Sequence, residues 1–222
     1  ICLRQCLYSK GSESTLINRV PMIYLLGGTP RVGKSIIAET LAEARAIPYY
    51  ATDDICRSYQ ATLSLEEREQ HFQLPELSGD AAKNILTSSE WVKRQIQSAQ
   101  ALEAPLTLLI GEALVSERSL ILEGVHLLPT FADQLRRTYG TDAFSVLYLL
   151  STDRTLLKTG MQQDRRENNW LRQTDEAVLE QFTHYIAEYG QFLKKECERL
   201  HLPFLERTSS FATDTANALQ LL

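Results

Sequence analysis

The sequence predicts a three-layer α/β fold, in which a five-stranded parallel sheet is flanked by helices on both faces. Short, continuous apolar runs are typical of strands that are covered on both sides, as in a parallel sheet. These runs alternate with segments whose apolar residues recur at helical spacing. A glycine-rich loop joins the first run to the first helical segment. Together, these observations favour one domain built from strand–helix units.

The expected strands are the apolar runs at 21–26, 47–52, 143–150 and 202–206, together with a run inside 119–129 that ends at Glu123 and Gly124. Between them, the spacing predicts helices over about 34–47, around 63–72 and over 91–115, where Pro105 implies a kink or a break. Ser151 or Thr152 is expected to cap a helix after the fourth strand, and Thr174 the last long helix. A short tail helix ends the sequence.

Composition limits the class of protein. The chain has 222 residues, of which 44% are hydrophobic, and a formal net charge of −5. This suits one medium-sized domain over 21–222 that follows a polar tail at 1–20, and it disfavours bulk binding to DNA or RNA. No stretch approaches the roughly 18 apolar residues of a membrane span. The four cysteines have neither redox-pair nor zinc spacing, so free thiols in the cytoplasm are expected at Cys2, Cys6, Cys56 and Cys197.

The glycine loop carries the strongest functional signal. Its sequence, GTPRVGKS, fits G-x-x-x-x-G-K-[ST], and it lies between a predicted strand and a predicted helix. In this context the backbone N–H groups and the helix N-terminus bind phosphate. Lys34 would reach the β- and γ-phosphates, and Ser35 would supply a hydroxyl to Mg²⁺. The expected nucleotide-binding residues are Gly28, Thr29, Pro30, Arg31, Val32, Gly33, Lys34, Ser35 and Ile36.

Acidic residues follow two other predicted strands, at the edge of the sheet where ligands bind in such folds. Glu123 ends the third strand and is a candidate for holding Mg²⁺ through water. Asp53 and Asp54 end the second strand. One of them would orient an acceptor hydroxyl and take its proton, while the other caps the next helix. Asp53 is favoured for the base and Asp54 for the cap, and Arg57 is placed to pair with an anionic acceptor.

Basic residues after the fourth strand suggest a lid over about 153–172. Phosphoryl transfer needs positive charge over the transferred oxygens and exclusion of water. Arg165 and Arg166 are the preferred catalytic candidates. Arg154, Lys158 and Arg172 are further basic residues of this segment. His126, shortly after Glu123, is a candidate for lining the acceptor site, although a lone histidine at a strand end is more often structural.

The segments GGTPRVGKS, TDD and ILEGVHLLP together resemble the 2-phosphoglycerate kinases and their P-loop kinase relatives. EGVHLLP is the most distinctive part, and the similarity spans about 21–205. The resemblance implies a P-loop kinase fold like that of the nucleoside monophosphate kinases. It also implies ATP with Mg²⁺ and a small phosphorylated hydroxy acid as acceptor. The acceptor-binding helical region would then be about 55–115.

Two other classes of function remain open. A nucleotide-binding regulatory module would bind the triphosphate with little or no acceptor phosphorylation. An N-K-x-D-like element for reading a guanine base is absent, since ENNW lacks both the lysine and the aspartate. A polynucleotide kinase is disfavoured by the acidic charge balance. The leading hypothesis is a small-molecule kinase.

Overall fold

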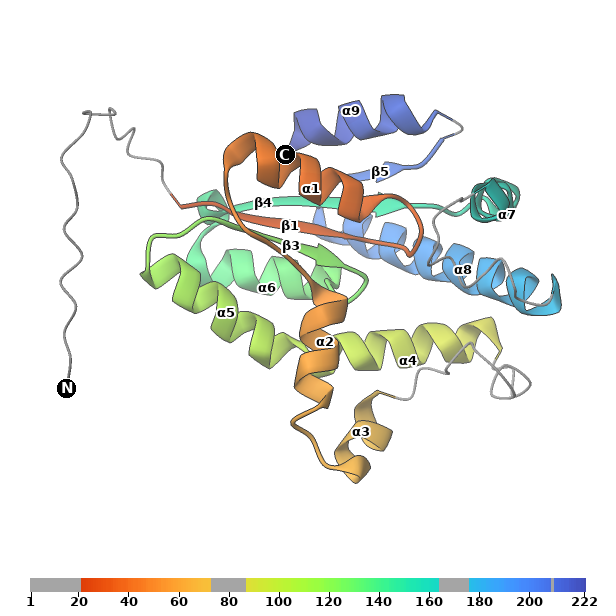
Figure 1. Cartoon of the computed structure of the whole chain (residues 1–222), viewed down its shortest axis with the longest axis horizontal. Helices are drawn as coiled ribbons and strands as arrows, with labels where there is room; N and C mark the ends of the chain where they lie inside the picture. The colour runs from red at the N-terminus through yellow and green to blue at the C-terminus, as the bar shows by residue number, and fades with distance from the viewer. Residues whose placement is uncertain (1–20, 73–86, 164–175, 209) are drawn as a thin grey trace, which may run out of the picture.

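The computed structural model describes residues 21–72, 87–163, 176–208 and 210–222, which form a parallel sheet between two layers of helices (Figure 1). The strands are β1 (Ile23–Gly28), β2 (Tyr49–Ala51), β3 (Leu120–Gly124), β4 (Phe144–Leu150) and β5 (Phe204–Glu206). Their order is β2-β3-β1-β4-β5, and every neighbouring pair is parallel. The predicted α/β fold and its five parallel strands are therefore confirmed.

Helices cover both faces of this sheet. They are α1 (Lys34–Arg45), α2 (Thr52–Gln60), α3 (Leu65–His71), α4 (Ser88–Ala101), α5 (Glu103–Val115), α6 (Pro129–Tyr139), α7 (Arg154–Gln163), α8 (Glu176–Leu200) and α9 (Phe211–Leu221), with a 3₁₀ turn, η2 (Thr141–Ala143). Helices α1 and α9 lie on one face, while α4, α5, α6 and α8 lie on the other (Figure 1).

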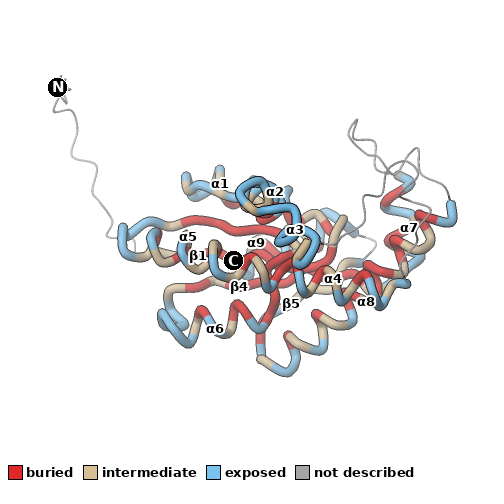
Figure 2. The backbone as a smooth tube through the Cα atoms, turned by 90° about the horizontal axis from the view of Figure 1, so that it is seen from below, coloured by how far each residue is buried: buried red, intermediate tan, exposed pale blue. Residues whose placement is uncertain are grey.

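The sheet separates two hydrophobic clusters, because successive side chains of a strand point to opposite faces. In β1, Ile23 and Leu25 belong to the larger cluster under α4, α5, α6 and α8. Tyr24 and Leu26 belong to the smaller cluster under α1 and α9. Figure 2 shows the central strands as a continuous buried band. Full burial of one such leucine contributes about 1.5–3 kcal/mol relative to exposure, so both layers are held firmly to the sheet.

The helical segment predicted over 91–115 is two helices. Helix α4 ends at Ala101 and α5 begins at Glu103, with Leu102 between them. Pro105 lies in the first turn of α5, where its missing N–H removes no hydrogen bond of the helix. The break expected at this proline is therefore confirmed, and it falls just before the ring.

The cap of α7 differs from the prediction. Oδ1 of Asp153 accepts hydrogen bonds from the backbone N–H groups of Thr155 and Leu156, at 2.8 and 3.1 Å. Asp153 is thus the N-cap, in place of Ser151 or Thr152, because its carboxylate reaches two unpaired N–H groups of the first turn. The predicted cap of α8, Thr174, lies outside the described residues.

The register of the sheet places the predicted site residues at one edge. Gly27 of β1 lies opposite Gly124 of β3, and Ala51 of β2 lies opposite Glu123. The loop after β1, the start of α2 and the end of β3 therefore meet at the carboxyl ends of neighbouring strands, where α/β sheets bind ligands.

Two of the four cysteines fall in the described part of the chain. Cys56 and Cys197 are both buried and form no disulfide, as expected, while Cys2 and Cys6 lie outside the described residues. None of the described helices has the length and apolar character needed to cross a membrane.

Candidate active site

The glycine loop turns between β1 and α1 through left-handed backbone. Gly28, Arg31 and Gly33 all have positive φ, at 132°, 63° and 86°. Helix α1 has no acidic residue in its first turn and no side chain that caps it. Its first N–H groups therefore remain available to an anion, which the helix dipole also favours. This is the geometry that the predicted phosphate site requires.

Lys34 lies inside the site and not in solvent. Its side chain is buried, and Nζ donates a hydrogen bond to the carbonyl oxygen of Thr29 at 2.7 Å. Burial lowers the pKa of the ammonium, while the carboxylates of Glu123 and Asp53 act in the opposite direction. An ammonium has three N–H groups, so Lys34 can bind a phosphate oxygen and keep its contact with the loop.

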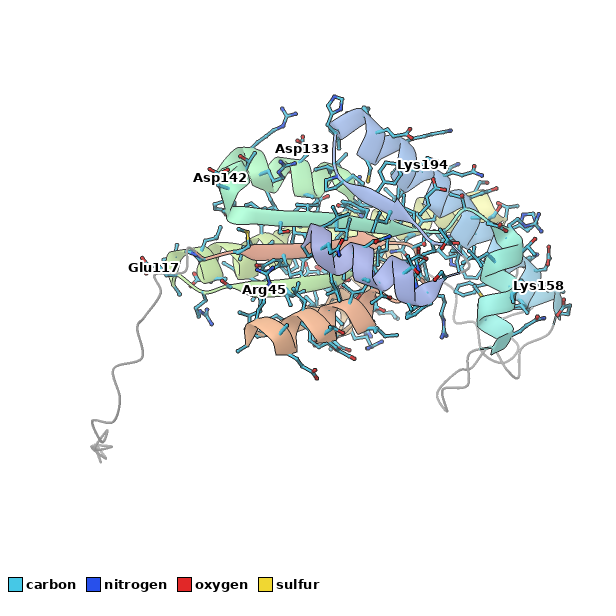
Figure 3. All side chains as sticks on the ribbon, turned by 90° about the horizontal axis from the view of Figure 1, so that it is seen from above. Arg45, Glu117, Asp133, Asp142, Lys158 and Lys194 are labelled. Carbon is cyan, nitrogen blue, oxygen red and sulfur yellow. The ribbon has the colours of Figure 1, made fainter. Side chains whose placement is uncertain are left out.

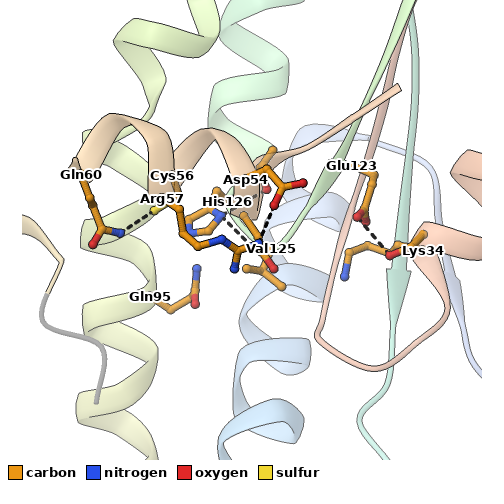
Figure 4. A network of polar contacts seen from close by, with 12 residues as sticks. Lys34, Asp54, Cys56, Arg57, Gln60, Gln95, Glu123, Val125 and His126 are labelled. Carbon is orange, nitrogen blue, oxygen red and sulfur yellow. Dashed lines mark hydrogen bonds and ion pairs between the residues drawn. The ribbon is translucent and has the colours of Figure 1, made fainter. Parts of the chain in front are cut away.

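Ser35 and Glu123, the two residues predicted to hold the metal, contact each other directly. Oγ of Ser35 donates to Oε1 of Glu123 at 3.1 Å (Figure 4). Burial raises the pKa of Glu123, and the nearby charge of Lys34 opposes this shift. No group of three or more Asp, Glu, His or Cys side chains in the described residues could enclose a metal. The oxygens of this pair fit Mg²⁺, which binds one or two protein groups together with phosphates and water.

The two aspartates after β2 differ from the prediction in one respect. Helix α2 begins at Thr52, with Ala51 as its N-cap and no side-chain cap. Asp54 is therefore not the cap, because both aspartates already lie within the first turn, where the helix dipole favours negative charge. The side chain of Asp54 pairs with Arg57 at 2.5 Å, and both side chains are 72% exposed.

His126 lies in the turn that follows β3. Its ring is buried, with Nδ1 at 3.2 Å from Oγ1 of Thr52 and 3.4 Å from Oδ1 of Asp53. Gly124 precedes it with φ +150°, and a Cβ there would lie 1.8 Å from Oγ1 of Thr52. The ends of β2 and β3 therefore pack together at a position that only glycine fits.

One cavity of about 670 Å³ joins these elements. It is lined by the glycine loop, by Asp53, by Glu123 with the two residues that follow it, and by Gly160 and Met161 of α7. Asp54, Arg57 and His126 are not among its lining residues. Of the three acceptor-binding candidates, none borders this cavity directly, whereas the candidate base and the metal-binding pair do.

The basic residues of α7 are engaged elsewhere. Arg154 donates to Glu180 of α8, and Lys158 forms ion pairs with Glu176 and Glu180. Figure 3 shows Lys158 at the periphery, beside α8. In this structure the acids of α8 hold both side chains, and neither borders the cavity beside the glycine loop. Arg165, Arg166 and Arg172 lie outside the described residues, so their roles remain predictions.

A second group of residues, which the sequence did not single out, lies beside the loop in the segment between β5 and α9. The guanidinium of Arg207 stacks at 4.2 Å over the ring of Phe211 and lies 3.6 Å from Asp214. Burial lowers the pKa of Arg207, and its Nη1 is buried without a hydrogen-bond partner. Arg207 and Phe211 border a cavity of about 450 Å³ beside Arg31 and Val32. Their position after the fifth strand, at the ligand edge, was the signal available in the sequence.

No protein-family model matches the chain, and neither does any curated protein. Among solved structures, the chain is similar to a gluconokinase from Sinorhizobium meliloti 1021, with 16% identity and a TM-score of 0.49 over 91% of this chain and 92% of that one. It is also similar to shikimate kinase from Acinetobacter baumannii in complex with shikimate, with 15% identity and a TM-score of 0.47 over 92% and 93%. The residues of the site itself therefore carry the functional interpretation.

Proposed function

We propose that the protein is an ATP-dependent small-molecule kinase that transfers the γ-phosphoryl group to a hydroxyl of a small acceptor. The observation that supports this best is the meeting of Lys34, the Ser35–Glu123 pair and Asp53 at one cavity. A phosphate anchor and a metal-binding pair alone would fit any nucleotide-binding protein. The carboxylate of Asp53, which borders the same cavity, adds the group that an alcohol acceptor requires.

In this proposal, the loop and the N-terminus of α1 bind the triphosphate, and Lys34 neutralises charge on its β- and γ-phosphates. Ser35 and Glu123 would hold Mg²⁺, which supplies positive charge to the phosphate oxygens when bound. Two carboxylates lie near a single ammonium in this region. A divalent cation would therefore also relieve the repulsion between Glu123 and an incoming polyphosphate.

Asp53 would act as the base. The acceptor hydroxyl oxygen forms a bond to the γ-phosphorus, the bond from that phosphorus to the bridging oxygen of ADP breaks, and the hydroxyl proton passes to Asp53. Positioning and charge stabilisation supply most of the acceleration in such a transfer. Gly160 and Met161 of α7 border the cavity, so the proposed lid at 153–172 would close over the transferred group.

The acceptor is proposed to be a small anionic hydroxy compound such as 2-phosphoglycerate, bound by the helical region at 55–115. Arg57 is the basic residue of α2. Its ion pair with Asp54 is exposed to solvent and therefore weak, so Arg57 can exchange Asp54 for an anionic acceptor. Arg165 and Arg166 would supply further positive charge. The base of the nucleotide would lie in the second cavity, beside Arg207 and Phe211.

The deciding experiment measures ADP release from ATP and Mg²⁺ over a panel of acceptors. The panel contains phosphorylated hydroxy acids, sugar acids, sugars and nucleosides. We expect acceptor-dependent turnover that Lys34→Ala abolishes and Lys195→Ala, at an exposed lysine on α8, leaves unchanged. ATP binding with no turnover on any acceptor would instead support a nucleotide-binding regulatory module.

A second comparison tests the base. Asp53→Asn should lose turnover while retaining ATP binding and thermal stability, whereas Asp54→Asn should retain most of the turnover. Equal turnover in both variants would rule out Asp53 as the base.

A further inference from the structure

The contacts of His126 point away from the acceptor and toward Asp53. The ring is 4% exposed, and its Nδ1 faces two oxygens, Oγ1 of Thr52 and Oδ1 of Asp53. Figure 4 shows the ring under the first turn of α2, beside Val125. A buried side chain that does not border the cavity cannot readily touch a substrate. It can, however, set the orientation of the aspartate that does border it.

The turn that carries His126 is held from the opposite side. The hydroxyl of Tyr189, on α8, donates to the carbonyl oxygen of Val125 at 2.6 Å. On the other side Gly124 packs against Thr52 so closely that no Cβ would fit. The ring is thus anchored to β3 and α8, while Asp53 belongs to α2. A hydrogen bond between them would tie the candidate base to the rigid sheet.

The protonation state follows from the surroundings of the ring. Burial lowers the pKa of His126 to about 4, with the charge of Lys34 acting in the same direction and that of Asp53 opposing it. The imidazole is therefore neutral near pH 7 and carries one N–H. A carboxylate oxygen only accepts hydrogen bonds. With the proton on Nδ1, the N–H faces Oδ1 of Asp53 at 3.4 Å. In the other tautomer, the Nδ1 lone pair could accept from the hydroxyl of Thr52 at 3.2 Å but would face the negative charge of the carboxylate.

We propose that His126 is a positioning residue, whose Nδ1–H holds Oδ1 of Asp53 so that the other carboxylate oxygen is presented to the acceptor hydroxyl. This inference rests on the proposed function and replaces the expectation that His126 binds the acceptor. A fixed carboxylate needs no reorientation during the transfer, which is the advantage of positioning in catalysis. The ring would itself gain or lose no proton during the reaction.

The first test needs no turnover. In protein labelled with ¹⁵N at histidine, the two ring nitrogens of His126 report which one is protonated, and His126→Asn assigns its signals among the four histidines. We expect a neutral ring protonated on Nδ1, and a shift of that signal in Asp53→Asn. A ring protonated on Nε2, or a signal unaffected by Asp53→Asn, would overturn the proposal even if no acceptor were found.

The second test uses two conservative variants. The amide nitrogen of asparagine can take the place of Nδ1, whereas that of glutamine reaches the place of Nε2. We expect His126→Gln to lower kcat by roughly tenfold or more with KM for ATP and acceptor unchanged. His126→Asn should stay within about threefold of the wild type. Equal losses in both variants would mean that the ring acts only through packing. A raised KM for the acceptor at constant kcat would mean direct contact with it.

Discussion

The hydroxyl of Ser35 donates to the carboxylate of Glu123 across 88 residues of sequence, at 3.1 Å. The contact joins the second residue of α1 to the carboxyl end of a buried strand, β3. It places two oxygen atoms side by side at the edge of the first cavity, where Mg²⁺ is proposed to bind. Because Mg²⁺ usually binds only one or two protein groups, the loss of either oxygen should weaken Mg²⁺ binding measurably.

We therefore expect Ser35→Ala and Glu123→Gln to raise the Mg²⁺ concentration for half-maximal ADP release by roughly tenfold each. The measurement is a Mg²⁺ titration at saturating ATP. Ser89→Ala, on the exposed surface of α4, is the matched control and should leave the titration unchanged. If both site variants followed the wild-type curve, Ser35 and Glu123 would not be the metal-binding pair.

The stability of the protein should also depend on pH through Glu123, because burial raises the pKa of its carboxyl group. A carboxyl with a raised folded pKa binds its proton more tightly in the folded state. Its ionisation therefore opposes folding above that pKa, and the effect vanishes below the unfolded value of about 4.3. Relative to the wild type, Glu123→Gln should thus gain stability as the pH rises from about 4 toward 7.

Urea unfolding of both proteins at several pH values, without nucleotide or metal, measures this difference. A difference that stays constant with pH would show that Glu123 does not titrate abnormally in the folded protein.

The strands and the phosphate loop could be predicted because their signals are local. A continuous apolar run such as 143–150 is buried on both sides, and the GKS motif requires a strand before it and a helix after it. The start of α2 was missed because aspartate is a favoured N-cap, so Asp54 was expected there. The structure begins the helix three residues earlier, with Ala51 as the N-cap and Thr52 packed against Gly124.

The charges of α7 could not be assigned from sequence for a different reason. A run with Arg154 and Lys158 is equally suited to cover a phosphate or to pair with acids on another helix. Here the partners are on α8, with Glu180 lying 26 residues from Arg154 and 22 from Lys158. Only the packing of the two helices decides between these roles. Arg207 could not be identified for the same reason, because its stacking on Phe211 and its ion pair with Asp214 exist only in the folded chain.

The contact between Gly124 and Thr52 predicts a large stability effect. In Gly124→Ala a methyl group would lie 1.8 Å from Oγ1 of Thr52, and φ of +150° would strain any residue with a side chain. We expect a loss of about 3 kcal/mol, which lowers the melting temperature by roughly 6–12 °C in a chain of this size. Thermal unfolding measures it.

Gly160→Ala is the matched control for this loss. A Cβ at Gly160 meets nothing within 4 Å. Alanine within helix α7 should stabilise the protein by about 0.5–1 kcal/mol through helix propensity. A drop in melting temperature of the same size in both variants would contradict the proposed close contact.

The stack of Arg207 on Phe211 predicts which kinetic constant the second cavity controls. Arg207→Met removes the buried guanidinium, while Asp214 keeps its hydrogen bonds from N and Oγ1 of Thr208, at 2.8 and 3.0 Å, so the segment should remain folded. If the nucleotide base lies beside this stack, KM for ATP should rise about tenfold, corresponding to about 1.4 kcal/mol, with little change in kcat. Phe211→Ala should act in the same direction.

Arg137→Met, at an exposed ion pair on α6, should change neither constant. An unchanged KM for ATP in both site variants would place the base elsewhere. A loss confined to kcat would instead indicate that Arg207 acts on the transferred phosphoryl group, because a residue that stabilises only the transition state leaves ground-state binding intact.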